Sequence, residues 1–115
     1  MEEYLEEMYR FELEGREIGT KMLAKRLGIK MPSVSGMLSK LKKGGFIEYR
    51  VRGNIMLTKR GRTVGRKIYS RFIRLKFILT GLGMRKTETE REACVLEHAI
   101  SERLMGLIER RIAER

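Results

Sequence analysis

Two apolar helical patterns, separated by only a short turn in the first half of the chain, constrain the fold most strongly. The first pattern has Thr20 as its N-cap and ends at Gly28. The second has Pro32 in its first turn and ends at the glycine pair 44–45. Two helices joined so closely indicate a helix-turn-helix. Residues 2–14 form an earlier, acidic helical pattern, which predicts a helix in front of this motif.

Strand-type residues follow the second pattern on both sides of a Gly-Asn turn. The segments FIEYRV and IMLT flank this turn and predict a β-hairpin, and hence a winged helix. From Thr58 an apolar stripe continues at helical spacing to residue 83. This helix would be roughly 35–40 Å long at about 1.5 Å per residue. We expect it to reach a partner subunit, and we expect a last helix over about residues 88–113.

The predicted fold class is mainly α with a small β-hairpin wing. Residues 1–60 would form a winged helix-turn-helix DNA-binding domain, and residues 61–115 a helical dimerisation arm. No apolar run is long enough to span a bilayer, and the acidic start is not a signal peptide. The single cysteine excludes an internal disulfide framework and fits a cytoplasmic protein.

Positive charge is concentrated in the middle of the chain. The formal net charge is +11, of which residues 1–14 carry −5, residues 15–83 carry +16 and residues 84–115 carry none. This distribution predicts an anionic partner, with double-stranded DNA ahead of a membrane. The stretch 58–83 could also be a basic amphipathic helix on anionic lipid. A core-facing stripe explains its position after a wing better, so we expect no membrane partner.

The second helix of the helix-turn-helix has small or basic residues at its exposed positions. Short side chains let bases approach a helix in the major groove, and cations pair with phosphates. The alternative is an ordinary solvated helix face, which the concentrated charge disfavours. No arginine or asparagine stands out as a base reader. The candidate DNA-binding residues, including two at the wing tip, are Lys30, Ser33, Ser35, Gly36, Ser39, Lys40, Arg50 and Arg52.

The only cysteine and the only histidine of the chain stand four residues apart in the segment EREACVLEHAIS. On a helix, Cys94 and His98 would lie roughly 40° apart, and Glu97 roughly 60° from Cys94. A thiolate, a carboxylate and an imidazole at this spacing can reach one transition-metal ion. A core cysteine beside a surface Glu–His hydrogen bond explains the same residues, and spacing alone leaves both open.

A nucleophile–base pair is a third interpretation of Cys94 and His98. No oxyanion-hole loop and no third orienting group is suggested by the sequence. We therefore expect neither an enzyme nor a small organic substrate.

Four segments of the chain resemble the diphtheria-toxin-repressor family of metal-dependent transcriptional repressors. They are YLEEMYRFELEG, LAKRLGIKMPSVSGMLSKLKKGGFIEY, LTKRGR and EREACVLEHAIS, and the resemblance covers about residues 2–113. It implies a winged-helix domain joined to a helical dimerisation and metal-binding domain. It also implies a homodimer that binds a DNA operator when a divalent metal acts as corepressor, and that controls metal-homeostasis genes.

The resemblance further implies a ligand set. The primary site would take Cys94, Glu97 and His98 from the last helix and Glu3 from the first. Two further carboxylates stand at positions related to family metal sites, and these additional candidates are Glu6 and Glu90. Thiolate favours Fe(II) and the carboxylates favour Mn(II), so either ion is the expected cofactor. Zn(II), Co(II) and Ni(II) are expected to bind in vitro.

Two positions depart from the family pattern. The second metal site of the family uses a His and a Glu on the long helix, where this chain has Arg71 and Leu75. We therefore expect one metal per subunit, with Arg71 as a fixed positive charge beside Glu6 or Glu90. The SH3-like domain of many members is expected to be absent. The alternative function is a metal-independent winged-helix regulator that has lost part of the metal site.

Overall fold

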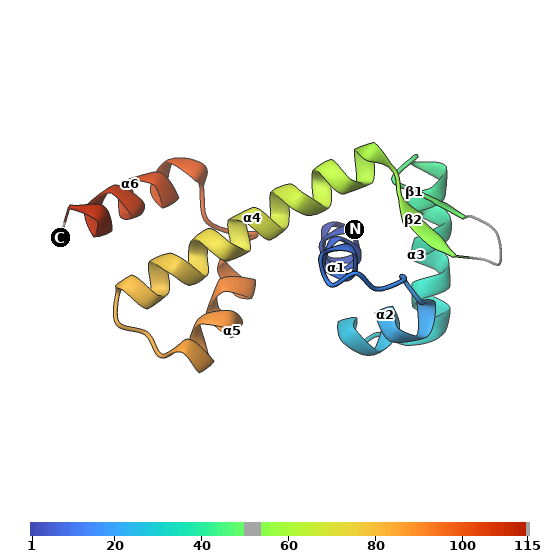
Figure 1. Cartoon of the computed structure of the whole chain (residues 1–115), viewed down its shortest axis with the longest axis horizontal. Coiled ribbons are helices and arrows are strands. Elements are labelled where there is room, and N and C mark those ends of the chain that lie inside the picture. The colour runs from blue at the N-terminus through green and yellow to red at the C-terminus, as the bar shows by residue number, and fades with distance from the viewer. Residues whose placement is uncertain (50–53, 115) are drawn as a thin grey trace. The chain divides into compact units, whose positions relative to one another are not determined.

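The computed structural model describes residues 1–49 and 54–114 (Figure 1). Within these residues the predicted class, mainly α-helical with a small hairpin wing, is confirmed. The chain divides into two compact units, Met1–Tyr69 and Ser70–Arg115. The elements in chain order are α1 (Glu2–Leu13), α2 (Thr20–Leu27), α3 (Met31–Lys43), β1 (Ile47–Tyr49), β2 (Ile55–Leu57), α4 (Lys59–Gly81), α5 (Lys86–Leu96) and α6 (Glu102–Ala113).

One hydrophobic core holds the first unit together. Apolar residues recur every three or four positions on α1, α2 and α3, so each helix turns one face inward. The hairpin closes the core, because Ile47 on β1 lies opposite Leu57 on β2 and both are buried. Figure 1 shows this hairpin alongside α3. Side chains with no exposed surface in this core include Leu5, Met8, Leu23, Val34 and Leu41.

The helix-turn-helix has the expected boundaries at its turn. α2 ends at Gly28, which adopts the left-handed conformation at φ 66° that favours glycine. Pro32 lies in the first turn of α3, where its missing N–H costs nothing. The N-cap of α2 is Gly19, one residue before the predicted Thr20. The outer face of α3 is exposed.

The first half of α4 packs closely on α1. Gly65 has no side chain, and a Cβ there would lie 3.1 Å from Cβ of Tyr9 and 3.0 Å from the carbonyl carbon of Leu5. Arg62 donates two hydrogen bonds of 2.8 Å to the carboxylate of Glu12 on α1. This half of the long helix is therefore part of the winged-helix unit.

The second unit contains the rest of α4 together with α5 and α6, which flank it (Figure 1). Its buried apolar side chains come from all three helices and include Phe72, Leu75, Ala93 and Met105. Leu82, at the end of the stripe predicted for the long helix, is exposed. In the described part of the chain, no helix is both long and apolar enough to cross a membrane.

The prediction of one helix over residues 88–113 is wrong. α5 ends at Leu96, and α6 starts at Glu102. The side chain of Ser101 caps α6 by accepting a hydrogen bond of 3.1 Å from the backbone N–H of Leu104. Such a cap, with an acidic residue in the first turn, stabilises a new helix start. Because the helix breaks, Leu104 does not continue the apolar face of α5 and is exposed.

Candidate DNA-binding surface and metal centre

The predicted DNA-binding residues of α3 and its preceding turn are all exposed. Lys30 is the N-cap of the helix, and the other five residues lie on α3 itself. The opposite face buries Val34, Leu38 and Leu41 in the core. α3 thus presents a surface of small polar side chains and two cations, made by Lys30, Ser33, Ser35, Gly36, Ser39 and Lys40. The predicted residues Arg50 and Arg52 lie outside the described residues.

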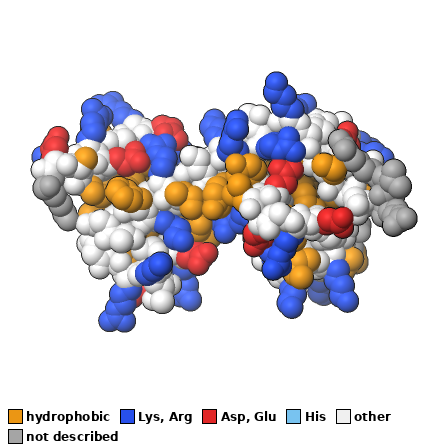
Figure 2. All heavy atoms as spheres, viewed as in Figure 1, with side chains coloured by type: hydrophobic (Ala, Val, Ile, Leu, Met, Phe, Trp, Pro, Cys, Tyr) orange, Lys and Arg blue, Asp and Glu red, His pale blue; other side chains and the backbone are white. Residues whose placement is uncertain are grey.

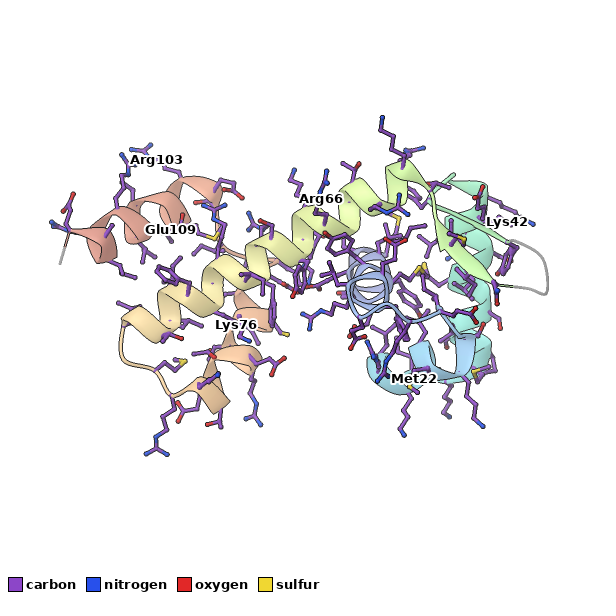
Figure 3. The ribbon with its side chains drawn as sticks, in the orientation of Figure 1. Met22, Lys42, Arg66, Lys76, Arg103 and Glu109 are labelled. Atoms are coloured by element: carbon purple, nitrogen blue, oxygen red, sulfur yellow. The ribbon has the colours of Figure 1, made fainter. Side chains whose placement is uncertain are left out.

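Further cations surround the C-terminal end of α3. The ammonium of Lys42 lies 5.1 Å from the ring centre of Tyr49 on β1 (Figure 3). Arg60, on α4, donates a hydrogen bond of 2.8 Å to the carbonyl oxygen of Gly44 and stacks over the ring of Phe46. Arg60 was not predicted as a site residue, although it lies in the basic segment LTKRGR. Figure 2 shows Lys and Arg side chains projecting from many parts of the surface.

Two of the predicted metal ligands lie together at the end of α5. Nε2 of His98 is 3.3 Å from Oε1 of Glu97. The side chain of Glu97 is buried, whereas that of His98 is 33% exposed. Cys94 lies one turn earlier on α5 and is exposed. These nitrogen, oxygen and sulfur donors fit a transition-metal ion in kind.

The predicted ligands are divided between the two units. Among the residues it describes, no three His, Cys, Asp or Glu side chains are grouped so that they could hold one ion. Glu3 and Glu6 belong to the first unit, whereas the donors of α5 belong to the second. Glu3 is exposed; Glu6 is buried and accepts a hydrogen bond of 3.3 Å from Arg10. Glu90 is exposed on α5.

Arg71 binds the turn between α5 and α6. Its Nε donates to the carbonyl oxygen of Glu97 at 3.0 Å, and its Nη2 donates to that of Ile100. Its Nη1 donates to the carboxylate of Glu102 at 2.6 Å. Within the second unit, the carboxylate that accepts from Arg71 is thus that of Glu102, whereas Glu90 had been expected there. The other expected carboxylate, Glu6, belongs to the first unit. The sequence could not indicate the bond to Glu102, because the turn itself was not predicted.

A second arginine, Arg74, links α4 to α6. Among the described residues, its hydrogen bonds go to side chains of α6 and not to the turn before it. Arg74 donates to the carboxylate of Glu109 at 2.6 and 3.1 Å, and to that of Glu102 at 2.9 Å. Hydrogen bonds from Arg74 hold the pKa of the Glu109 carboxyl below its usual value. Figure 3 labels Glu109 on α6. These bonds fix the start and middle of α6 against the long helix.

Comparison with known proteins assigns both parts of the chain. Residues 1–54 match the N-terminal DNA binding domain of iron dependent repressors. Residues 58–114 match the metal binding and dimerisation domain of the same repressors. The chain belongs to the iron-dependent repressor family. The resemblance drawn from the sequence is thereby confirmed, and the family is one of transcriptional regulators rather than enzymes.

Individual relatives agree with this assignment. An uncharacterized HTH-type transcriptional regulator of Methanocaldococcus jannaschii is 37% identical over 91% of this chain and 86% of its own length. The HTH-type transcriptional regulator MntR of Geobacillus kaustophilus is 28% identical over 88% of this chain and 72% of its own. A manganese-dependent transcriptional repressor in complex with manganese is 32% identical, with a TM-score of 0.79 over 96% of this chain. The chain spans about half, 51%, of the length of that solved protein.

Proposed function

We propose that this chain is a DNA-binding transcriptional repressor whose affinity for its operator rises when a divalent metal binds. The observation that carries the proposal is that the same chain has two features. One is the face of α3 with exposed small and basic side chains, and the other is the set of metal-binding donor atoms of Cys94, Glu97 and His98. Each feature lies in the segment that matches the corresponding family domain. Metal-homeostasis genes are the proposed targets, and the cytoplasm is the proposed site of action.

The proposed primary ligands are Cys94, Glu97 and His98, with Glu3 as the fourth. A bound ion supplies a fixed double positive charge that holds these donors in one arrangement. The Cys94 thiol supports Fe(II), whereas the carboxylates and the manganese-dependent relative support Mn(II). The ion can alter DNA affinity only if it binds the DNA-competent arrangement more tightly than others. Glu6 and Glu90 are the secondary candidates.

A homodimer is the proposed assembly. The second unit exposes large apolar side chains on α4, α5 and α6 and in the turn after α4, and a partner subunit would cover them. Repressors with a helix-turn-helix commonly use dimers to bind two half-sites. The exposed residues are Ile73, Phe77, Leu82, Val95, Leu104 and Leu107. Light scattering at micromolar concentration tests this, and a monomeric mass would contradict it.

Fluorescence anisotropy with labelled DNA from upstream of the gene tests the function. Binding is measured in chelator and then with Mn(II) or Fe(II), for the wild type, His98→Ala and Glu92→Gln. Glu92 is a matched control, because it is exposed on α5 and is not a proposed ligand. We expect metal-dependent binding by the wild type and by Glu92→Gln, and its loss in His98→Ala. Equal binding in chelator and metal would refute the corepressor role.

A metal-independent winged-helix regulator is the second candidate function. It is favoured by Arg71, whose guanidinium already holds the α5–α6 turn through three acceptors. A protein cation in this place could keep the second unit ordered with no ion bound. DNA binding that is unaffected by chelator and by His98→Ala would support this function.

A further inference from the structure

The backbone around the proposed ligands is held by one side chain from another helix. Glu97 follows α5 as its C-cap, and Ile100 lies three residues later in the turn. Arg71 of α4 donates to the carbonyl oxygens of both residues. His98 lies between these two carbonyls in the chain. The segment that carries the imidazole is thus fixed on both of its sides.

A guanidinium suits this task better than other cationic groups. The last carbonyls of a helix have no partner within the helix, and a cation there also interacts favourably with the helix dipole. Arginine has five donors in a rigid fork, so one side chain can serve two carbonyls and a carboxylate together. The Arg71 side chain is only 14% exposed, which strengthens charge-assisted hydrogen bonds.

We propose that Arg71 is a positioning residue of the metal site. By holding the carbonyls of Glu97 and Ile100, it orients the Glu97 carboxylate and the His98 imidazole toward one ion. This inference rests on the proposed function, because it assumes that these two side chains are ligands. Groups that orient metal ligands typically change metal affinity about 10- to 100-fold when removed.

Variants of two neighbouring residues, Arg74 and Glu102, distinguish an effect of Arg71 on the turn from an effect on overall stability. The described bonds of Arg74 go to the carboxylates of Glu102 and Glu109, so Arg74→Ala removes α4–α6 ion pairs and leaves the turn carbonyls bound. Glu102→Gln removes the carboxylate partner of Arg71 and also leaves both carbonyl bonds. Arg71→Lys keeps the charge but has one donor nitrogen instead of three.

The test is a titration with cobalt(II) of the full chain and four variants: Arg71→Ala, Arg71→Lys, Arg74→Ala and Glu102→Gln. Absorption reports both the affinity and the ligand field, including the thiolate-to-cobalt band of Cys94. Thermal unfolding in chelator measures stability separately. We expect both Arg71 variants to lose about 10- to 100-fold in cobalt affinity and to change the spectrum. The Arg74 and Glu102 variants should keep the wild-type affinity and spectrum, even if their unfolding temperature falls.

The positioning role would be overturned if a folded Arg71→Lys variant bound cobalt with the same affinity and the same spectrum as Arg74→Ala. This variant also decides the question if Arg71→Ala does not fold. If only Arg71 is misassigned, the wild type still binds cobalt and still requires metal for DNA binding. A wild type that binds no cobalt would overturn both this inference and the metal-dependent function.

Discussion

Gly65 is a position where one added methyl group should weaken the winged-helix unit. It lies in the half of α4 that packs on α1, and it is buried. An alanine Cβ there would be 3.0 Å from the carbonyl carbon of Leu5 and 3.1 Å from Cβ of Tyr9, with the Leu5 carbonyl oxygen closer still. Ordinary contact begins at 3.4 Å. Neither the backbone nor a Cβ can rotate away, so α1 or α4 must move.

Two opposing effects set the size of the change. Alanine gains about 1 kcal/mol over glycine in a helix interior. Overpacking typically costs about 1–3 kcal/mol, and the rigid neighbours at Gly65 place this site at the upper end. Gly65→Ala should therefore lower the free energy of unfolding by about 1–2 kcal/mol. Gly36→Ala is the matched control, because Gly36 is also within a helix and an added Cβ meets nothing within 4 Å.

Urea unfolding followed by circular dichroism measures the difference. Gly36→Ala should raise the free energy of unfolding by about 0.5–1 kcal/mol, so the two variants shift in opposite directions. With a slope of about 1–3 kcal/mol per molar urea, their midpoints should differ by about 1 M. A Gly65→Ala protein as stable as Gly36→Ala would refute the close packing of α4 on α1.

Three further predictions concern the DNA surface and α6. Lys40→Ala should weaken operator binding and reduce the slope of log affinity against log salt by about 0.9. The control Lys86→Ala, on α5, should change neither the affinity nor the slope. Fluorescence anisotropy at several salt concentrations measures both quantities. Arg74→Ala should cost up to about 1 kcal/mol at neutral pH. The pKa of Glu109 is lowered from 4.5 in the folded state, so this stabilisation is complete above pH 4.5 and is lost as the pH falls through the lowered pKa. Thermal unfolding of the wild type and Arg74→Ala across this pH range measures the loss. Ser101→Ala should remove the cap of α6 and cost about 1 kcal/mol in urea unfolding, while an unchanged midpoint would show that the cap contributes nothing.

Local signals were sufficient to predict most of the first unit. Gly28 and Pro32 mark the turn of the helix-turn-helix, and the apolar stripes identify the faces that α1 and α3 bury. The division between α5 and α6 was not predicted, because apolar residues continue at helical spacing through residues 97–101. The signal present there was Ser101 followed by an acidic residue, a short capping pattern that the longer periodicity obscured.

The sequence was sufficient to predict the residue types of the candidate metal site, but not the hydrogen bonds that hold its backbone. Cys94 and His98 attract notice because each is the only residue of its type. The role of Arg71 depends on main-chain carbonyls of Glu97 and Ile100, which carry no sequence signal. Such acceptors become apparent only when the turn is folded against α4. Tertiary contacts of this kind lie beyond what helical periodicity can indicate.

Metal affinity in the presence and absence of operator DNA is the most direct test of the coupling between the two sites. If a bound ion raises DNA affinity by some factor, DNA must raise the affinity for the ion by the same factor. Titrating Mn(II) into free and DNA-bound protein, beside the anisotropy measurement, gives both factors. We predict equal factors greater than about 5, the lower range of typical coupling between sites. Identical Mn(II) affinity with and without DNA would contradict the proposed corepressor function.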